Sequence, residues 1–591
     1  MMSQPKTRPF SFSRWIVLAL ALCSFCLSAL VSRTVFERLP HLEDEMAYLY
    51  GARLMARGTW VTDTPEPRRS YWQPFVVDYQ GNRFSKYTPG WSMQLAAGEL
   101  MGQHWVINGF FAALVVALAY RLGRDIFNAD TGVIAAALVT FSPAALLLNG
   151  SLMGHTSALF AAALFLYAYW RIESARRPLL WGVIGGIALG LLVINRPLTG
   201  IGIAAPLAIR SAIRLIRAAS ERGDTPLFTR VLGVVRPLVA LGGITLVFAL
   251  VVPLYNAAAT GDPRFNLYTL VWPYDRAGFG PCCGRSGHTL EKGIRHLRFD
   301  MSLTAADLFG WTAGEVTPEV TAHLQNDSDY LPIVGLSFAL LPLGLVVAFR
   351  WKVIAVIVWG AALVGWTVWP FTVSGGALTR DAYFAWVWLI AAVAWVNLPI
   401  LLWRDRQKAW AWLLIAVTLT LIGTQIAYWV GSQRYSTRYF YEAMISAAIL
   451  SALPLAWLAR RFSRPLVYGA LVAVTAWGVG NYTALRLMAL YRYNLISPDV
   501  IAQVEARREG DRPVLVIVSG DDVRWRAMGA LMAQTSPFLD SEIVVAHNYR
   551  TADPQLRADI LGRFPDHQVI EMLGSGNQAW FADQPPPAPP P

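Results

Sequence analysis

The sequence predicts an all-α membrane protein that crosses the bilayer many times. Of its 591 residues, 55% are hydrophobic and only 15% are charged, and the mean hydropathy is +0.41. This composition is too apolar for an ordinary soluble domain. Apolar runs close to the roughly 20 residues that span a bilayer recur along most of the chain. Together these observations indicate a bundle of transmembrane helices.

We expect about thirteen membrane helices, because that many apolar runs approach the spanning length. Their approximate ranges are 14–35, 105–122, 131–149, 151–171, 179–195, 198–217, 232–256, 330–349, 352–373, 382–403, 409–430, 440–459 and 465–490. Lys6, Arg8 and Arg14 precede the first run, but this run is long enough to span and no small-residue cleavage site follows it. It is therefore interpreted as an uncleaved first helix.

Basic residues in the short connections predict the orientation of the bundle in the plasma membrane. Lys and Arg gather in alternate connections, among them 171–177, 404–408 and 460–464, as expected of segments that stay in the cytoplasm. This places the N-terminus in the cytoplasm, and an odd number of helices then places the chain after residue 493 outside. Since the formal net charge of +12 comes largely from these clusters, no nucleic acid is expected as a partner.

The chain divides into three expected segments. Residues 1–493 form the transmembrane module, with long external loops at 36–104 and 257–329. Residues 494–580 are expected to form a small external α/β domain, because short apolar runs typical of buried strands alternate there with helical stretches. Residues 581–591 are a proline-rich disordered end. The four cysteines, which include the adjacent Cys282 and Cys283, indicate neither a disulfide framework nor a zinc site.

Local patterns also predict structure in the first external loop. Apolar spacing predicts a helix over 42–57 that lies along the membrane surface and ends before Gly58. Two short alternating runs within 75–87, separated by Gln-Gly-Asn, predict a β-hairpin. A second surface helix is expected to begin at about Trp91.

Three consecutive acidic residues, Glu43, Asp44 and Glu45, stand at the start of the first of these helices. One interpretation makes Asp44 or Glu45 a general base that accepts a proton from a hydroxyl group. The other is a solvated helix start, where acidic residues interact favourably with the helix dipole. The spacing alone leaves both interpretations open.

Three strings resemble motifs of the GT-C fold, polyprenyl-phosphate-dependent glycosyltransferases, which include the protein mannosyltransferases and the lipid A aminoarabinose transferase. The string 38–53, RLPHLEDEMAYLYGAR, resembles their Asp-Glu motif; 85–90, SKYTPG, resembles a Lys-Tyr-Pro-Pro-Gly segment; and 121–127, RLGRDIF, resembles their first cytoplasmic loop. The resemblance implies that Asp44 is the catalytic carboxylate, that Glu45 supports it, and that Lys86 contacts the donor phosphate.

The chain departs from this resemblance in the turn 149–155, NGSLMGH, where a second acidic residue is often found. No carboxylate occurs in this turn, so an arrangement of two carboxylates is in doubt there. His155 is a candidate substrate contact at this position. The alternative is that His155 is a hydrogen-bonded packing residue, as single histidines in apolar helices commonly are.

A carboxylate on the outer side implies a lipid-linked donor, because nucleotide sugars stay in the cytosol. Phosphate is already a good leaving group, so cations that neutralise it matter more than a general acid. Arg196, Arg434 and Arg438 lie in short external connections, against the usual charge bias, and are candidates for this role. Their alternative role is to anchor the helix ends at the interface. Arg380 is expected to pair with its neighbour Asp381.

The second external loop contains the string 272–288, WPYDRAGFGPCCGRSGH. Glycines beside aromatic residues are compatible with a tight loop over a sugar, with Tyr274, Asp275, Arg276 and His288 as candidate polar contacts. The alternative is a structural cap on the bundle. The sequence shows neither the spacing of a catalytic triad nor that of a metal site, so no cofactor is predicted, although a divalent metal is compatible with the reaction.

We therefore expect a membrane glycosyltransferase, a hexosyl- or pentosyltransferase. It would move a sugar from a polyprenyl-phosphate donor to a hydroxyl of a glycan, lipid or protein at the external face of the membrane. Two alternatives are a flippase for a lipid-linked saccharide and a glycan polymerase or ligase. A flippase should place ionisable residues or broken helices near the middle of the membrane, whereas here the polar groups concentrate on one side.

Overall fold

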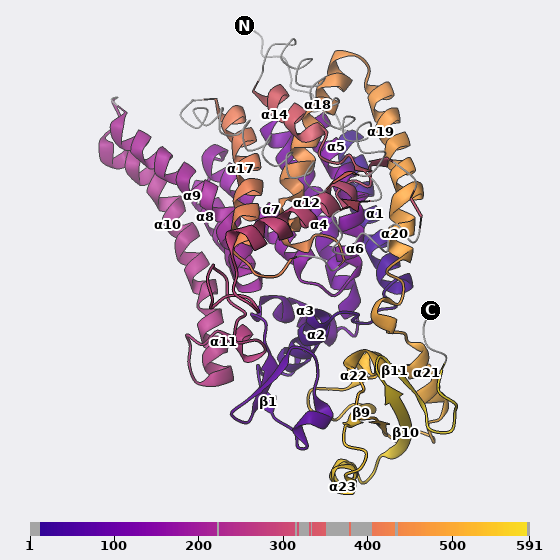
Figure 1. Ribbon diagram of the computed structural model, residues 1–591. Helices are drawn as coiled ribbons and strands as arrows, with labels where there is room; N and C mark the ends of the chain where they lie inside the picture. Colours follow the sequence, from indigo (N-terminus) through magenta and orange to yellow (C-terminus); the bar gives the residue numbers. More distant parts are fainter. Residues whose placement is uncertain are drawn as a thin grey trace.

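The computed structural model describes residues 12–221, 224–313, 316–317, 330–331, 334–349, 378–379, 405–431 and 435–587. A bundle of long helices occupies one half of the molecule (Figure 1). The first external loop and the C-terminal sheet lie together at the opposite end from the start of α1. The polar segments are thus gathered at one end of the bundle.

Among the described residues, seven helices are long and apolar enough to cross a membrane, and an eighth span results if the bent pair α5 and α6, at 57°, counts as one. The membrane bundle is as expected, whereas the number thirteen stays a prediction, because the expected spans at 352–373 and 382–403 lie outside the described residues. The helices of the bundle are α1 (Phe12–Thr34), α4 (Ile107–Ile126), α5 (Ala129–Thr140), α6 (Pro143–Gly150), α7 (His155–Ser174), α8 (Pro178–Asn195), α9 (Pro197–Ser220), α10 (Leu227–Ala249), α11 (Val251–Thr260), α14 (Leu340–Ala348), α17 (Arg406–Ile426), α18 (Met444–Arg461), α19 (Arg464–Gly478) and α20 (Ala484–Met488).

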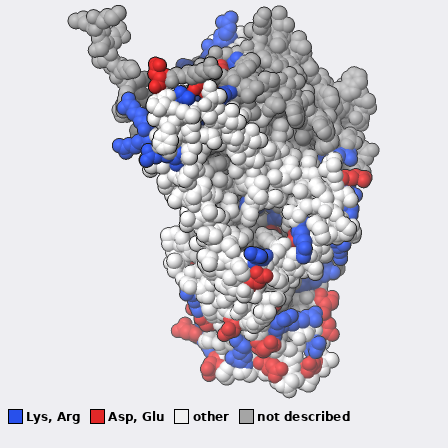
Figure 2. All heavy atoms as spheres, turned by 90° about the vertical axis from the view of Figure 1, so that its left-hand side faces the viewer, with Lys and Arg blue, Asp and Glu red and all other residues white. Residues whose placement is uncertain are grey.

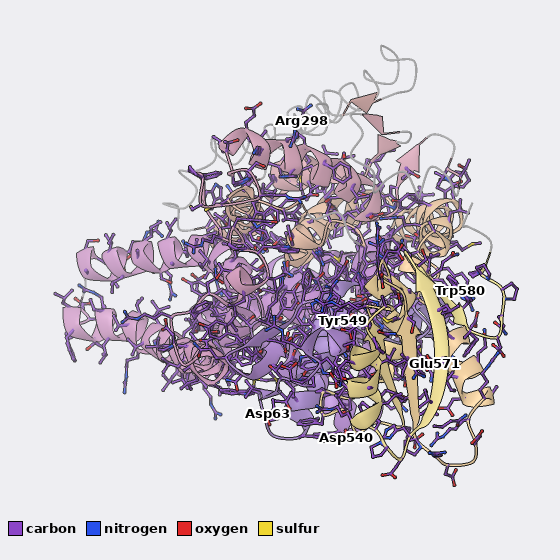
Figure 3. All side chains as sticks on the ribbon, turned by 60° about the horizontal axis from the view of Figure 1, so that its bottom comes forward. Asp63, Arg298, Asp540, Tyr549, Glu571 and Trp580 are labelled. Atoms are coloured by element: carbon purple, nitrogen blue, oxygen red, sulfur yellow. The ribbon has the colours of Figure 1, made fainter. Side chains whose placement is uncertain are left out.

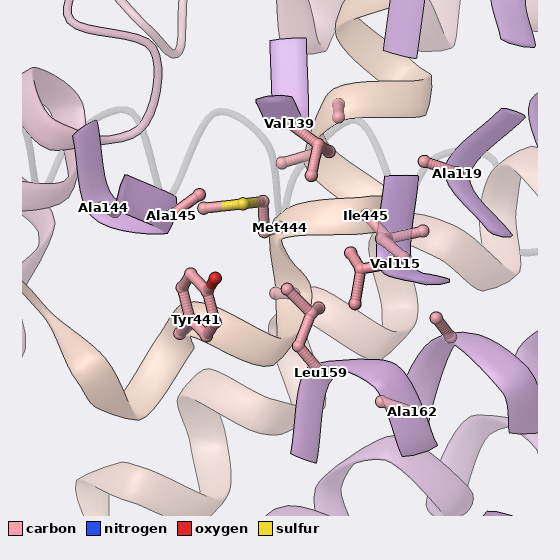
Figure 4. Close-up of a cluster of buried hydrophobic side chains, with 14 of the residues drawn as sticks. Val115, Ala119, Val139, Ala144, Ala145, Leu159, Ala162, Tyr441, Met444 and Ile445 are labelled. Carbon is pink, nitrogen blue, oxygen red and sulfur yellow. The ribbon is translucent and has the colours of Figure 1, made fainter. Parts of the chain in front are cut away.

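The interior of the bundle is packed with small and medium apolar side chains. Val115 and Ala119 of α4 lie beside Leu159 and Ala162 of α7, with Ile445 of α18 close by (Figure 4). Small residues allow helix backbones to approach closely where lipid leaves little hydrophobic drive for association. On the face shown in Figure 2 the middle carries mostly uncharged side chains, whereas mixed charges gather at the end that carries the loops and Lys and Arg side chains gather at the other end. This uncharged middle suits a lipid environment.

The first external loop folds largely as predicted. It contains α2 (Glu43–Ala56), the strands β1 (Thr62–Asp63), β2 (Val76–Tyr79) and β3 (Asn82–Ser85), and α3 (Gly90–Leu100). The hairpin turn has left-handed backbone at Gln80 and Gly81. However, α2 is not an exposed surface helix. Ala47 and Tyr48 pack into the bundle core, while Met46 and Leu49 pack against the C-terminal segment, so α2 lies between the two.

The C-terminal segment has the alternation that its sequence predicts. The strands β8 (Val514–Ser519), β9 (Ile543–Asn548) and β10 (Gln568–Ser575) are parallel, and β11 (Gln578–Phe581) adds an antiparallel edge that was not predicted, in the order β11-β10-β8-β9. The helices are α21 (Asp499–Ala506), α22 (Gly529–Gln534) and α23 (Pro554–Gly562). The domain boundary at residue 493 stays a prediction.

The C-terminal sheet is attached to the first external loop on one side. Arg57 forms an exposed ion pair with Asp540, and the guanidinium of Arg69 lies 4.5 Å from the ring centre of Tyr549. In Figure 3, Asp540 and Tyr549 lie where the sheet meets that loop, whereas Trp580 lies away from it.

The second external loop contains an unpredicted helix, α12 (Leu290–Asp307), which Thr289 caps.

Candidate functional site

A polar cavity lies where α2 and the end of β3 meet α7, α9, α17 and the segment η5 (Arg438–Ala443). It contains about 960 Å³ of empty space, part of it open to solvent. The residues that line it are Asp44, Tyr48, Lys86, Tyr87, His155, Asn195, Arg196, Pro197, Leu198, Thr199, Asn266, Tyr268, Asp275, Ala277, Gln425, Tyr428, Arg438 and Tyr439.

Asp44 is the carboxylate of α2 that reaches this cavity. Its Oδ1 accepts a hydrogen bond of 2.5 Å from the Tyr87 hydroxyl, and its Oδ2 lies 3.3 Å from Nη1 of Arg438. Burial alone would raise the pKa of Asp44, but Arg438, Tyr87 and Lys86 outweigh this effect and hold the pKa below its ordinary value. Asp44 is therefore an ionised hydrogen-bond acceptor at neutral pH.

Glu45 points away from the cavity, since successive residues of a helix face different directions. Its Oε2 accepts hydrogen bonds from the backbone N–H of His41 and Leu42, and its Oε1 accepts one of 2.7 Å from the N–H of Leu152. The hydroxyl of Tyr435 also donates to it. Burial raises the pKa of Glu45 to about 7, and these four donors oppose the rise. The carboxylate thus joins the start of α2 to the bundle.

Lys86 follows directly after β3 and projects its ammonium group into the cavity. Its Nζ lies 3.6 Å from Oδ2 of Asp275, 3.7 Å from the ring centre of Phe75 and 4.6 Å from that of Trp272. Burial lowers the pKa of Lys86, and the carboxylates of Asp275 and Asp44 oppose this shift. The aromatic rings stabilise the cation through their π faces and fix its position.

Arg196 lies at the break between α8 and α9, lines the cavity and contacts two buried groups. Its Nη1 donates to Nε2 of His155, and its Nε lies 3.1 Å from Oε1 of Glu442. Nδ1 of His155 has no hydrogen-bond partner. Glu442 was not predicted as a site residue, yet through Arg196 it is linked to His155, the last residue of the turn where the sequence lacks a carboxylate.

The candidates of the second external loop separate into two groups. Asp275 lines the cavity, and its Oδ1 accepts hydrogen bonds from the Tyr428 hydroxyl at 2.9 Å and the indole N–H of Trp429 at 3.0 Å. Tyr274, Arg276 and His288 do not line it. Tyr274 packs against Trp429, and Arg276 is exposed. His288 donates to the Ile426 carbonyl, as a structural cap would. Arg434 and Arg380 lie outside the described residues.

Tyrosines form much of the remaining wall, and sequence reasoning did not select them. Tyr48, Tyr87, Tyr268, Tyr428 and Tyr439 all line the cavity. Tyr87 and Tyr439 directly follow the candidate cations Lys86 and Arg438 in the sequence, so this adjacency was the available signal. The other three come from separate helices and loops, and no local pattern brings them together.

The segments that carry Lys86 and Arg196 touch through their backbones. The Thr88 hydroxyl donates to the Asn195 carbonyl at 3.1 Å. A Cβ atom added at Gly90 would lie 2.6 Å from the backbone of Ile194 and 2.7 Å from the nitrogen of Asn195. Only glycine therefore fits at position 90 without moving the two segments apart.

A second cavity, which is almost entirely apolar, lies beside the polar one. It has about 560 Å³ of empty space and is lined by side chains of α12, α14, α17, α18 and η5, among them Leu308, Leu341, Leu419, Phe440 and Met444. Phe440 directly follows Tyr439, which lines the polar cavity.

Within the described part of the chain, no three His, Cys, Asp or Glu side chains are grouped to hold a metal ion.

The fold and this cavity define a multi-pass membrane protein with a charged site at the loop end of its bundle. No protein-family model matches the sequence, and no curated protein matches it significantly. The apo oligosaccharyltransferase of Archaeoglobus fulgidus is a similar solved structure, with 13% identity, a TM-score of 0.45, and 95% of this chain and 70% of that chain covered. ArnT from Cupriavidus metallidurans bound to undecaprenyl phosphate is another, with 15% identity, a TM-score of 0.44, and 95% and 93% covered.

A third similar structure is the Archaeoglobus fulgidus oligosaccharyltransferase AglB in complex with an inhibitory peptide and a dolichol-phosphate. It has 14% identity and a TM-score of 0.44, and the match covers 95% of this chain and 69% of that chain. At TM-scores below 0.5 these likenesses carry no weight for the chemistry of this chain.

Proposed function

We propose that this protein is a glycosyltransferase that moves a sugar from a polyprenyl phosphate to an acceptor hydroxyl in the polar cavity. The observation that carries the proposal is that the ionised Asp44 shares one cavity with three cations, Lys86, Arg196 and Arg438. A carboxylate can accept the proton of an incoming hydroxyl group, and a cluster of cations can stabilise the negative charge of a departing phosphate.

The charges and free donors in the cavity favour a bound anion. Lys86, Arg196 and Arg438 outnumber the lining carboxylates Asp44 and Asp275. Nη1 of Arg438 lies 3.3 Å from Oδ2 of Asp44, whereas the buried Nε of Arg438 makes no hydrogen bond. A buried guanidinium donor without an acceptor is costly, and a phosphate group would supply the missing acceptor. Lys86 would add a point charge held by its aromatic surroundings.

Asp44 would orient the acceptor hydroxyl by accepting its hydrogen bond. Since its pKa is held low, it is a weak base, and it would take the proton late, as the acceptor oxygen bonds to the anomeric carbon. At the same time the bond between that carbon and the phosphate oxygen breaks, and the phosphate leaves with its electron pair. Attack from the side opposite the phosphate inverts the configuration of the anomeric carbon.

The apolar cavity supports a donor that carries a long hydrocarbon chain. It adjoins the polar cavity at η5, where Tyr439 lines the polar one and Phe440 the apolar one. A phosphate held by Arg438 would thus have apolar side chains next to it. Such a donor would enter from the bilayer with its head in the polar cavity.

Mass analysis of envelope glycans from cells with and without the protein would test the proposal. We expect one glycan to lose a single sugar when the protein is absent, and the Asp44→Asn variant to reproduce this loss. Glu43→Gln is the matched control, because Glu43 lies one residue earlier and does not line the cavity. An unchanged glycan profile in the Asp44→Asn strain, with the protein present at its normal level, would refute the proposal.

A further inference from the structure

A second cluster of charged residues lies at the far end of the bundle from the polar cavity. Glu173 of α7 is surrounded by three guanidinium groups. Nε of Arg210 and Nε of Arg214 lie 3.1 and 3.6 Å from its Oε1, and Nε of Arg406 lies 3.4 Å from its Oε2. The indole N–H of Trp410 donates to the same Oε2 at 2.9 Å. One carboxylate thus forms ion pairs with three arginines.

The cluster lies on three helices that also reach the polar cavity. His155 begins α7, Arg196 precedes α9 directly, and Gln425 stands near the end of α17, and all three line that cavity. At 1.5 Å per residue, Glu173 is about 27 Å along α7 from His155. In the predicted orientation this end of the bundle faces the cytoplasm.

The arginines keep donors that the protein does not satisfy. Nη1 of Arg210 and Nη1 of Arg214 are buried and have no hydrogen-bond partner. The side chain of Arg210 is only 8% exposed, whereas those of Arg214 and Arg406 are 19% and 30% exposed. A net positive charge with unpaired donors is unfavourable in a buried setting. An anion that approaches from the exposed side of Arg214 and Arg406 would remove both costs.

We propose that this cluster, Arg210, Arg214 and Arg406 around Glu173, binds the phosphate of an anionic phospholipid of the cytoplasmic leaflet. Guanidinium groups match phosphate oxygens in a forked geometry. The ring of Trp170 lies 3.5 Å from the guanidinium carbon of Arg406, and such aromatic residues are enriched at the headgroup level of membranes. The lipid source is favoured because Glu173 lies at the C-terminal end of α7 and Arg406 at the N-terminal end of α17, on the side of the bundle that the predicted orientation places in the cytoplasm.

The proposal predicts selective retention of anionic lipid. The full-length protein would be purified in detergent and titrated with phosphatidylglycerol, with phosphatidylcholine, and with inorganic phosphate, while bound lipid is counted by native mass spectrometry and the melting temperature is recorded. We expect phosphatidylglycerol to bind and to raise the melting temperature, and phosphatidylcholine to do neither. The variants Arg214→Gln and Arg406→Gln should bind phosphatidylglycerol about tenfold more weakly.

Two controls make the test decisive. Arg461→Gln removes an exposed arginine at the same end of the bundle and should leave lipid binding unchanged. Arg214→Lys keeps the charge but loses the fork, and should weaken binding less than Arg214→Gln. Equal binding of phosphatidylglycerol by the wild type and both glutamine variants would overturn the proposal. A melting shift with inorganic phosphate and none with the lipid would overturn the lipid assignment.

Discussion

The guanidinium of Arg438, at the start of η5, lies 3.3 Å from the carboxylate of Asp44, at the start of α2. The second carboxylate oxygen is held by Tyr87, so both oxygens of Asp44 have partners before any substrate arrives. This arrangement fixes the position of the carboxylate and favours its ionised form. It also separates Asp44 from Glu45, whose carboxylate is bound inside the protein.

Replacing Asp44 by Asn should remove most transfer activity and leave donor binding intact. The amide keeps the size of the side chain but accepts a hydroxyl proton far less readily, so we expect the rate to fall by about 100-fold or more. The rate would be measured with a labelled polyprenyl-phosphate sugar, and binding with undecaprenyl phosphate. A variant that keeps its rate would show that Asp44 does not act in the reaction.

Removing Arg438 should shift the acidic limb of the pH–rate profile. Arg438 lowers the pKa of Asp44, so in Arg438→Gln the pKa of Asp44 rises and less of it is ionised in mild acid. The activity should therefore decline at a higher pH than in the wild type as the solution is acidified. Arg461→Gln, far from the cavity, should leave the limb in place. An unchanged limb in Arg438→Gln would mean that Asp44 does not set it.

The decline of donor affinity at high pH should depend on Lys86. Burial lowers its pKa, so the ammonium loses its proton, and with it the attraction to phosphate, at a lower pH than an exposed lysine does. In Lys86→Arg the charge persists, because arginine stays protonated in proteins. We expect donor affinity at high pH to decline less in this variant, although its affinity at neutral pH falls about tenfold through altered fit. Parallel pH profiles for the two proteins would contradict this role.

Glu45 should affect stability rather than the reaction. Its pKa is raised from 4.5 to about 7, so the folded protein holds this proton more tightly than the unfolded chain does. This contribution to stability is fully present below pH 4.5 and is lost as the pH rises through about 7. A difference of about 3 kcal/mol in unfolding free energy follows. In Glu45→Gln, melting temperatures measured across this range should lose that dependence on pH.

The C-terminal segment should support the position of Asp44. Met46 and Leu49 of α2 pack in one cluster with Val516 and Leu531 of the C-terminal segment. A chain that ends at residue 493 would expose this face of α2, and we expect a lower melting temperature and reduced transfer. Arg57→Ala, which removes only an exposed ion pair to Asp540, should cost about 1 kcal/mol at most. Full activity of the shortened chain would show that α2 is held by the bundle alone.

Features set by neighbouring residues could be predicted from the sequence. The helix at 43–56, the hairpin at 76–85 and the alternation of strands and helices near the C-terminus all have local signals, and the structure has each of them. The structure places Asp44 and Lys86 in one cavity, while the roles that the motif resemblance implies for them stay predictions. These predictions needed no knowledge of the distant parts of the chain.

Contacts between distant segments could not be predicted in the same way. Glu442 reaches Arg196, and Tyr268 joins the cavity wall, only because separate helices and loops pack together. For the same reason the sequence could not separate Asp275, which lines the cavity, from Arg276, which is exposed. The burial of α2 was missed because its second partner is the C-terminal segment.

The absence of a side chain at Gly90 sets the distance between two segments of the cavity wall. Because backbone meets backbone there, the segment that carries Lys86 and the segment that carries Arg196 are as close together as the chain allows. A methyl group at position 90 would push these two segments apart, and it would change the separation of Lys86 and Arg196 for every substrate, whichever sugar it carries.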